Sequence, residues 1–284
     1  MNLVVGSSGM LGGMIARKQL ARGEPVRVLV RQPTTLEGAE SVVGDLKDPA
    51  SLAAACRGVT TVITTANSAQ RGGADNVDSV DLDGNRALID VASRAGVRQF
   101  VFVSVAFVDV GSPVPLFAAK ARTEHHLRES GLAWTIIAPH IFLDVWFGLL
   151  VGSALAAGMP VSLVRGGRAR HSFIAVDDVA EFAVRAVNHG AAMNRRLLLG
   201  GPDAISWSDI VEKTATILGR PVPVRSIEPG QPVPSLPPPH DAAIGGLAAS
   251  LEQQDVIIDA SEDARTFGVT LTPADTVLRR LLAS

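Results

Sequence analysis

The sequence contains no tyrosine and only one cysteine, Cys56, among its 284 residues. Without tyrosine, every mechanism that uses a tyrosine as general acid, general base or nucleophile is excluded. A single cysteine cannot form an intrachain disulfide, and it excludes a zinc site built on cysteines. It fits a reducing compartment, or a fold that needs no disulfide, and we expect a cytoplasmic protein.

The chain also lacks an excess of positive charge. Lys and Arg together number 26 and Asp and Glu 28, so the formal net charge is −2. Proteins that bind polyanions usually show a basic excess, so we expect no nucleic-acid partner. Apolar residues make up 47% and charged residues 19%, a composition typical of globular proteins.

A secretory leader is not expected, because Met1 to Val5 has no basic region and runs into a glycine-rich turn. One stretch, 145–164, has no charged residue and is long enough to span a bilayer. It is interrupted by several glycines, and Gly158 with Pro160 is typical of a helix stop. We therefore expect a buried helix followed by a strand at 161–164, and no membrane partner.

The first two-thirds of the chain alternates short apolar strands with helical segments. Nearly continuous apolar strands separated by helices are typical of a parallel sheet covered on both faces. The pattern predicts an α/β fold with a doubly wound parallel sheet, the Rossmann architecture. The expected strands are 2–5, 26–30, 42–43, 61–64, 100–104 and 134–137, and the expected helices are 12–22, 49–56, 77–95 and 115–130.

The last third differs in composition. The stretch 221–240 holds eight prolines in twenty residues, so it cannot form a regular helix or a central strand. We expect an extended connection or a lid there, with helices at 206–218 and 274–282 on either side. The sequence thus predicts a small, mostly helical C-terminal subdomain on the substrate side.

These features give two expected domains. Residues 1–200 form the dinucleotide-binding domain and include a segment at 140–165 that lines the substrate pocket. Residues 201–284 form the C-terminal subdomain, with the proline-rich lid at 221–240.

A glycine-rich turn follows the first strand and opens the first helix, with Gly6, Gly9 and Gly12 spaced G-x-x-G-x-x-G. The first glycine permits the tight turn, the second lets the backbone approach a pyrophosphate, and the third lets the helix pack closely on the strand. The free N–H groups of the helix N-terminus favour phosphate. The strand–turn–helix context indicates dinucleotide binding.

The end of the second strand favours NADP(H) over NAD(H). An NAD site places an acidic residue there to accept from the ribose 2′-hydroxyl. Here the strand ends at Arg31, and no Asp or Glu occurs between Val26 and Leu36. A guanidinium at this place can hold a 2′-phosphate by paired hydrogen bonds. A solvated loop residue is the alternative interpretation of Arg31.

Several stretches together resemble the NmrA-like group of the atypical short-chain dehydrogenase/reductases, a family of NAD(P)-binding proteins with a Rossmann fold. They are GSSGMLGG at 6–13, VRVLVRQP at 26–33, GDLKDP at 44–49, DLDGNRALIDVASRAGVRQFVFVS at 81–104, AKARTEHHLRESGLAWTIIAP at 119–139 and FIAVDDVAEFAVRAV at 173–187. The resemblance covers roughly residues 1–220.

The resemblance implies a set of cofactor-binding residues. Those implied at the pyrophosphate are Gly6, Ser8, Gly9, Met10 and Leu11. Those implied at the adenosine are Arg31, Asp45 and Leu46. Those implied beside the ribose and nicotinamide are Thr65, Ala66, Asn67, Ser104, Lys120, Pro139, His140 and Ile141.

One departure from the family matters for chemistry. Most short-chain dehydrogenases use Tyr-x-x-x-Lys, but the residue four before Lys120 is Leu116. A hydride can still be transferred to an electron-poor acceptor whose oxyanion takes a proton from water. Lys120 is then the candidate catalytic group, and His140 is a second candidate acid. A solvated helix lysine and a loop histidine bonded to backbone are the alternatives.

Two functions from different classes remain. One is an NADPH-dependent oxidoreductase that reduces a small apolar acceptor such as a quinone, with Phe142, Trp146, Phe147 and Leu150 lining the pocket. The other is a non-catalytic NADP(H)-binding redox sensor that reports to a protein partner. No metal is expected from the spacing of the histidines, and a homodimer is held open as the assembly.

Overall fold

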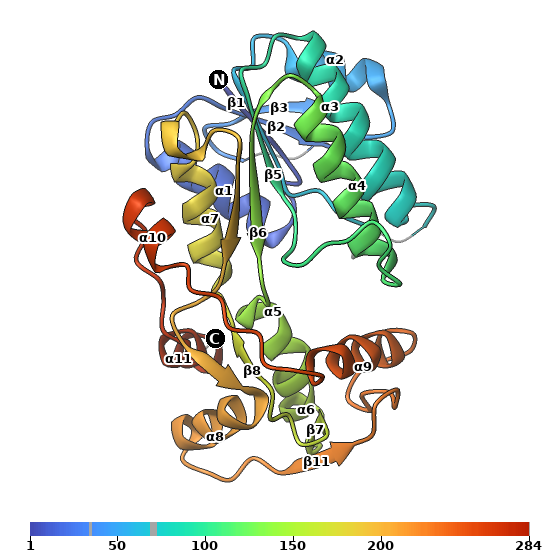
Figure 1. Ribbon diagram of the computed structural model, residues 1–284, viewed down its shortest axis with the longest axis vertical. Coiled ribbons are helices and arrows are strands. Elements are labelled where there is room, and N and C mark those ends of the chain that lie inside the picture. The colour runs from blue at the N-terminus through green and yellow to red at the C-terminus, as the bar shows by residue number, and fades with distance from the viewer. Residues whose placement is uncertain (34–35, 69–72, 284) are drawn as a thin grey trace. The chain divides into compact units, whose positions relative to one another are not determined.

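The computed structural model describes residues 1–33, 36–68 and 73–283 (Figure 1). The chain forms two compact units, each made of segments that are distant in the sequence. Unit 1 comprises Met1–Pro139, Asp177–Leu198 and Asp263–Val269. Unit 2 comprises His140–Val176, Leu199–Glu262 and Thr270–Ser284.

This division differs from the expected boundary near residue 200. The segment 140–165, expected in the first domain, lies in unit 2, and Asp177–Leu198 returns to unit 1. The reason is packing, because apolar side chains of 141–163 are buried together with those of 205–222 and 274–278. The sequence did not indicate that the two units are built from alternating segments of the chain.

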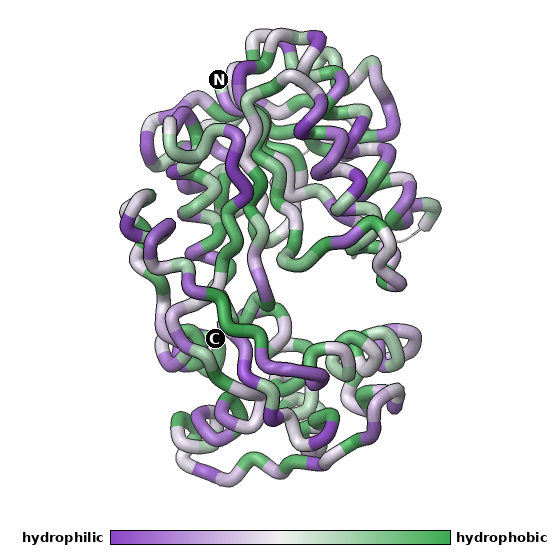
Figure 2. The backbone as a smooth tube through the Cα atoms, viewed as in Figure 1, coloured by the Kyte–Doolittle hydropathy of each residue, from purple (hydrophilic) through white to green (hydrophobic). Residues whose placement is uncertain are grey.

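Unit 1 is built on a seven-stranded sheet with the order β3-β2-β1-β4-β5-β6-β9. The ladders from β3 through β6 are all parallel, and the order reverses between β1 and β4, which confirms the doubly wound Rossmann fold. Figure 2 shows hydrophobic residues concentrated along these strands. The strands are β1 (Asn2–Val5), β2 (Val26–Val30), β3 (Glu40–Val43), β4 (Thr61–Thr64), β5 (Gln99–Val103), β6 (Ala133–Pro139) and β9 (Arg195–Leu199).

Helices cover both faces of this sheet (Figure 1). On one face lie α1 (Met10–Ala21) and α7 (Val176–Arg185). On the other lie α2 (Pro49–Cys56), α3 (Asn85–Arg94) and α4 (Pro115–Glu129). Burial of apolar surface between helix and sheet is the main favourable contribution to this packing. The smaller elements of unit 1 are η1 (Val77–Gly84), η3 (Gly190–Ala192) and α10 (Ser261–Phe267), whose first two residues belong to unit 2.

The expected helix at 77–95 has two parts. Residues 77–84 form the π-helix η1, and α3 begins at Asn85. Asn76 caps η1, and its side chain accepts a hydrogen bond of 2.9 Å from the Ser79 backbone N–H. A π-helix is rare and is frequently found at functional sites.

Unit 2 has two small sheets and its own apolar core. β7 (Val161–Val164) pairs in parallel with β11 (Val224–Ile227), and β8 (Arg170–Ser172) pairs antiparallel with β10 (Ala204–Ser206). Its helices are α5 (Leu143–Phe147), η2 (Gly148–Gly152), α6 (Ser153–Ala156), α8 (Trp207–Leu218), α9 (His240–Leu251) and α11 (Ala274–Ala283).

The proline-rich stretch at 221–240 is more regular than expected. It contains β11, because the four residues from Val224 to Ile227 include no proline and their N–H groups can pair with β7. β11 lies in a two-stranded sheet, so the exclusion of a central strand holds. The role of this stretch as a lid stays a prediction.

The uncharged stretch at 145–164 is divided among α5, η2, α6 and the strand β7. The expected strand at 161–164 is confirmed. Over the described residues, none of the helices combines the length and the hydrophobicity needed to cross a bilayer.

Candidate functional site

The glycine-rich turn is tightly packed at two of its three glycines. Gly6 has a φ of +92°, and a Cβ added to it would lie 2.6 Å from Oγ1 of Thr65. A Cβ on Gly12 would lie 2.3 Å from the carbonyl oxygen of Gly6. A Cβ on Gly9 would meet that oxygen only at 3.4 Å, an ordinary contact. The turn is therefore closed towards the sheet and leaves room above Gly9, as a pyrophosphate requires.

The N-terminus of α1 has features that favour binding of an anion. Its N-cap is Gly9, which has no side chain to bind the helix amides, and its first turn carries no acidic residue. Ser8 and Gly9 are exposed, and Met10 is 55% exposed. The N–H of Gly9 donates to the carbonyl of Gly6 at 3.0 Å. The exposed N-terminal end of α1 carries the positive end of the helix dipole, where the diphosphate is expected.

Charged residues gather at the ends of β2 and β3. Arg31 follows β2, and its Nη1 lies 3.1 Å from Oδ2 of Asp75. Lys47, which follows β3, also pairs with the Asp75 carboxylate. Its backbone N–H donates to Oδ1 of Asp45 at 2.8 Å, while Leu46 between them is buried. The sequence interpretation missed Lys47 and Asp75, although Lys47 lies in the quoted stretch at 44–49.

The segment after β4 is fixed by a buried amide. Asn85 accepts a hydrogen bond of 3.0 Å from Oγ1 of Thr64 and donates one of 3.3 Å to the carbonyl of Ala66. Thr65 donates from its backbone N–H to the carbonyl of Val5 at 3.0 Å. The segment after β4, which holds Thr65, Ala66 and Asn67, therefore starts beside Gly6 at the carboxyl ends of the strands.

Lys120 is a buried cation on α4. Its side chain is 6% exposed, and Nζ donates to the carbonyl oxygen of Val103 at 3.3 Å. Nζ also lies 3.6 Å from Oδ1 of Asp81 and 4.8 Å from the ring centre of Phe102. Burial lowers the pKa of Lys120, and the negative charges of Asp81 and Glu124 oppose that change.

Asp81 is the part of this site that the sequence interpretation missed. It lies on η1, is fully buried, and its Oδ2 accepts hydrogen bonds from the N–H and the hydroxyl of Ser68, at 2.9 and 2.7 Å. Asp81 thus links the segment after β4 to Lys120, 39 residues further along the chain. A carboxylate so placed stabilises the ammonium form of a buried lysine.

Ser104 lies beside this ion pair at the end of β5. It is 6% exposed, and within the described part of the chain its Oγ has no hydrogen-bond partner. Its backbone N–H donates to the carbonyl of Ile137 at 2.8 Å, and Val103 before it binds Lys120. Pro139, at the end of β6, accepts from the N–H of Ala106 at 2.9 Å. A buried hydroxyl without a partner is unusual, and at a strand end it is a candidate ligand group.

His140 belongs to unit 2, where it is bonded to a second histidine. Its Nε2 lies 3.2 Å from Nδ1 of His171, and Nε2 of His171 lies 3.0 Å from the carbonyl oxygen of Leu251. A carbonyl can only accept, so His171 carries its proton on Nε2, and His140 donates to Nδ1 of His171.

The surroundings of His140 keep its ring neutral. Burial, together with the neighbouring His171, lowers the pKa of His140 to about 4. Its backbone N–H donates to the carbonyl of Leu199 at 2.9 Å, and the next residue, Ile141, is buried in the core of unit 2. A ring that is neutral at pH 7 is a poor general acid. The catalytic role of His140 stays a prediction.

The four apolar residues expected to line a pocket differ in how deeply they are buried. Phe147 and Leu150 are 4% and 1% exposed, and both belong to the core of unit 2. Phe142 and Trp146 are half-buried. Only these last two keep surface that a ligand could contact.

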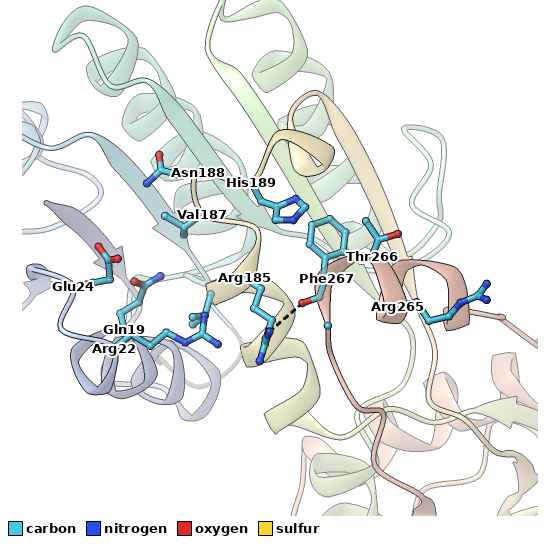
Figure 3. Close-up of a pocket in the computed structure, with 12 residues that line it drawn as sticks. Gln19, Arg22, Glu24, Arg185, Val187, Asn188, His189, Arg265, Thr266 and Phe267 are labelled. Carbon is cyan, nitrogen blue, oxygen red and sulfur yellow. Dashed lines mark hydrogen bonds between the residues drawn. The ribbon is translucent and has the colours of Figure 1, made fainter.

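A cavity of about 550 Å³ lies in unit 1 towards the amino-terminal ends of the parallel strands (Figure 3). It is lined by the C-terminal ends of α1 and α7 and by residues 265–268. Figure 3 shows Arg185 at its centre, bonded to the carbonyl of Phe267. The glycine-rich turn lies at the opposite, carboxyl end of the strands, because each helix runs antiparallel to the strand before it. None of the expected site residues lines this cavity.

A second hollow of about 620 Å³ runs along α4 in unit 1. Its lining includes the loop 107–110, Arg128 and Arg196. Among the described residues, no group of three or more potential metal ligands occurs.

Comparison with known proteins decides the family. A family model described as NAD(P)H-binding matches residues 6–190. The chain belongs to this NAD(P)H-binding family. The match begins at Gly6, the first residue of the glycine-rich turn, and the expectation of a nicotinamide dinucleotide is confirmed at the level of the family.

Relatives in this family carry different printed functions. A photosystem II assembly factor, Ycf39, of Trieres chinensis is 30% identical over 79% of this chain and 71% of its own length. An NAD(P)H azoreductase of Xenophilus azovorans is 28% identical over 78% of this chain and 75% of its own. Among solved structures, the NADPH complex of the Escherichia coli quinone oxidoreductase QOR2 has a TM-score of 0.81 at 19% identity, and the alignment covers 99% of this chain and 100% of that one. This last likeness concerns the fold.

Proposed function

We propose that the protein is an NADPH-dependent oxidoreductase that delivers a hydride to a small, apolar, electron-poor acceptor such as a quinone. The observation that carries the proposal is the buried Lys120, held by Asp81 and the carbonyl of Val103. Next to Val103 stands Ser104, whose hydroxyl has no hydrogen-bond partner among the described residues. Strongly perturbed pKa values cluster at functional sites, and burial lowers the pKa of Lys120.

The residues present fit the cofactor. The turn leaves room above Gly9, and the amides of α1 would hold the diphosphate. Arg31 would meet the adenosine ribose, with Asp45 and Leu46 beside the adenine. Thr65, Ala66 and Asn67 follow the turn towards the place where the nicotinamide is expected. Bound there, the reduced nicotinamide supplies the hydride.

The chemistry is arranged without a tyrosine. An ammonium at Lys120 would stabilise the oxyanion that an acceptor such as a quinone develops, and water can supply the proton. The hydroxyl of Ser104 would donate a hydrogen bond to the same developing charge. His140, neutral at pH 7, is not proposed as the proton donor. This division of roles suits acceptors that need no enzyme acid in the same step.

NADP(H) is proposed over NAD(H) because Arg31 ends β2 with no carboxylate in 26–36 to receive a ribose 2′-hydroxyl. The similar quinone oxidoreductase of E. coli was solved with NADPH, which supports the choice. The membership of the NmrA-like group, the cytoplasmic location and the homodimer stay predictions.

A second candidate is a non-catalytic NADP(H)-binding regulatory protein. The relatives named as photosystem II assembly factors favour it, since assembly requires contacts with other proteins. Phe107 and Val110, which are 55% and 56% exposed, would offer apolar contact area to such a partner. The absence of tyrosine also raises this candidate.

The test is NADPH oxidation, followed by absorbance, against quinones and azo compounds. We expect turnover with at least one acceptor, and a loss of about a hundredfold or more in Lys120→Met, the range typical for removal of one charge-stabilising donor. The control is Lys18→Met, because Lys18 is also held by carboxylates of unit 1, Asp177 and Glu181. Tight NADPH binding without turnover on any acceptor would favour the regulatory protein.

A further inference from the structure

Three charged side chains from separate segments of unit 1 meet beyond the ends of β2 and β3. Arg31 directly follows β2, Lys47 comes four residues after β3, and Asp75 lies two residues before η1. Nη1 of Arg31 is 3.1 Å from one carboxylate oxygen of Asp75, and Nζ of Lys47 pairs with the other. The two cations are therefore bridged by one carboxylate.

Exposure separates the members of this cluster. The side chain of Asp75 is 5% exposed, whereas those of Arg31 and Lys47 are 48% and 42% exposed. The carboxylate is thus covered, and both cations keep an outer half that faces solvent. Counted over the described residues, the cluster holds two positive charges and one negative charge, and its two cations are the exposed members.

The backbone fixes where this positive surface lies. Val30 and Val43, the last residues of β2 and β3, are paired in the sheet, so the two cations start from neighbouring strand ends. The N–H of Lys47 is held by Asp45, one of the residues implied at the adenosine. In a Rossmann fold the adenosine ribose lies at the end of the second strand.

We propose that Lys47 is a second ligand of the adenosine 2′-phosphate beside Arg31, and that Asp75 is a built-in counter-ion with which the phosphate competes. The proposal rests on the proposed binding of NADP(H). Without a 2′-phosphate, Asp75 keeps both cations paired. When a phosphate binds, its oxygens replace part of that pairing, and the remaining charge of Asp75 moderates the preference for NADP(H) over NAD(H).

The test uses the adenosine half of the cofactor alone, so it does not depend on activity. Isothermal titration calorimetry compares 2′,5′-ADP with 5′-AMP, which differ by the 2′-phosphate. In Lys47→Ala we expect the affinity for 2′,5′-ADP to fall about five- to tenfold, with 5′-AMP changed less than about twofold. In Asp75→Asn we expect 2′,5′-ADP to bind about threefold tighter, because one negative charge is removed while the shape is kept.

Lys18→Ala is the matched control. Lys18 is a lysine of unit 1 that pairs with two carboxylates, and its removal changes the net charge by the same amount. We expect it to leave the ratio of the two affinities unchanged. Higher salt should reduce the advantage of 2′,5′-ADP in the parent, and should do so less in Lys47→Ala.

Three results would overturn the proposal. Equal effects of Lys47→Ala on both ligands would remove Lys47 from the phosphate subsite. Weaker binding of 2′,5′-ADP in Asp75→Asn would show that Asp75 supports the phosphate instead of competing with it. Equal affinity of the parent for both ligands would remove the subsite altogether. Failure of the parent to bind either ligand or NADPH would contradict the proposed function itself.

Discussion

Unit 1 contains a buried basic side chain, Lys120, and unit 2 contains a half-buried one, His140, and the two have different partners. In unit 1, Lys120 has the carboxylate of Asp81 at 3.6 Å. In unit 2, His140 is bonded to His171, whose other nitrogen is bonded to the carbonyl of Leu251. Burial lowers the pKa of both side chains. The difference teaches that burial alone does not decide the charge of a basic group, because the partner within hydrogen-bond or ion-pair distance does.

Removal of the carboxylate from the lysine should have the largest effect. Asp81→Asn keeps an oxygen that can accept from Ser68 but leaves Lys120 buried without its counter-ion. We expect a loss of about 3–5 kcal/mol in the free energy of unfolding, measured in urea at pH 7. The double variant Asp81→Asn/Lys120→Met should recover most of that loss. A loss below about 1 kcal/mol would mean that the pair is not coupled as the structure indicates.

The histidine pair should make stability depend on pH. The pKa of His140 is about 4 when folded, below its unfolded value, so the unfolded state binds more protons as pH falls. The stabilisation is complete above about pH 6.5 and is lost towards pH 4, by about 3 kcal/mol in total.

The variant His140→Gln isolates this contribution, because glutamine can still donate to His171 but does not titrate in this range. Unfolding in urea at pH 7, 5.5 and 4.5 should give a flatter dependence on pH in the variant than in the parent. Burial lowers the pKa of His171, the carbonyl of Leu251 and the charge of Asp255 oppose that change, and His171 remains in both proteins. Identical pH profiles would contradict a neutral His140 with a lowered pKa.

A smaller effect should separate two glycines of the same turn. Gly12→Ala places a methyl 2.3 Å from the carbonyl of Gly6, and we expect a loss of about 1–3 kcal/mol in stability. Gly9→Ala places its methyl at 3.4 Å, so its stability should change by less than about 0.5 kcal/mol. Its affinity for NADPH, measured by fluorescence, should nevertheless fall. Unchanged affinity in Gly9→Ala would place the diphosphate elsewhere.

The smallest effect on stability is expected at Ser104. Within the described residues its hydroxyl has no partner, so Ser104→Ala removes no hydrogen bond and should change stability by less than about 0.5 kcal/mol. If the hydroxyl serves the reaction, NADPH oxidation should fall about tenfold or more. A clear loss of stability with full activity would assign Ser104 to the fold alone.

Much of the fold and part of the site could be predicted because their signals are local. The turn at Gly6 and the end of β2 at Arg31 each follow from a short run of sequence, and Lys120 is implied by the family resemblance. The partners of these residues come from distant segments, with Arg31 and Asp75 separated by 44 positions and His140 and His171 by 31. A single sequence does not show such pairings. For the same reason, the sequence did not predict that each unit is built from segments that are distant along the chain.

The central claim is that the charge of Lys120 serves the reduction of an acceptor. Its most direct test is the single-turnover oxidation of bound NADPH by a quinone, comparing the parent with Asp81→Asn/Lys120→Met. The double variant removes both charges together, so the buried site stays neutral and the fold is retained. We predict a rate at least about a hundredfold slower in the variant at saturating NADPH. Equal rates in the two proteins would contradict the account.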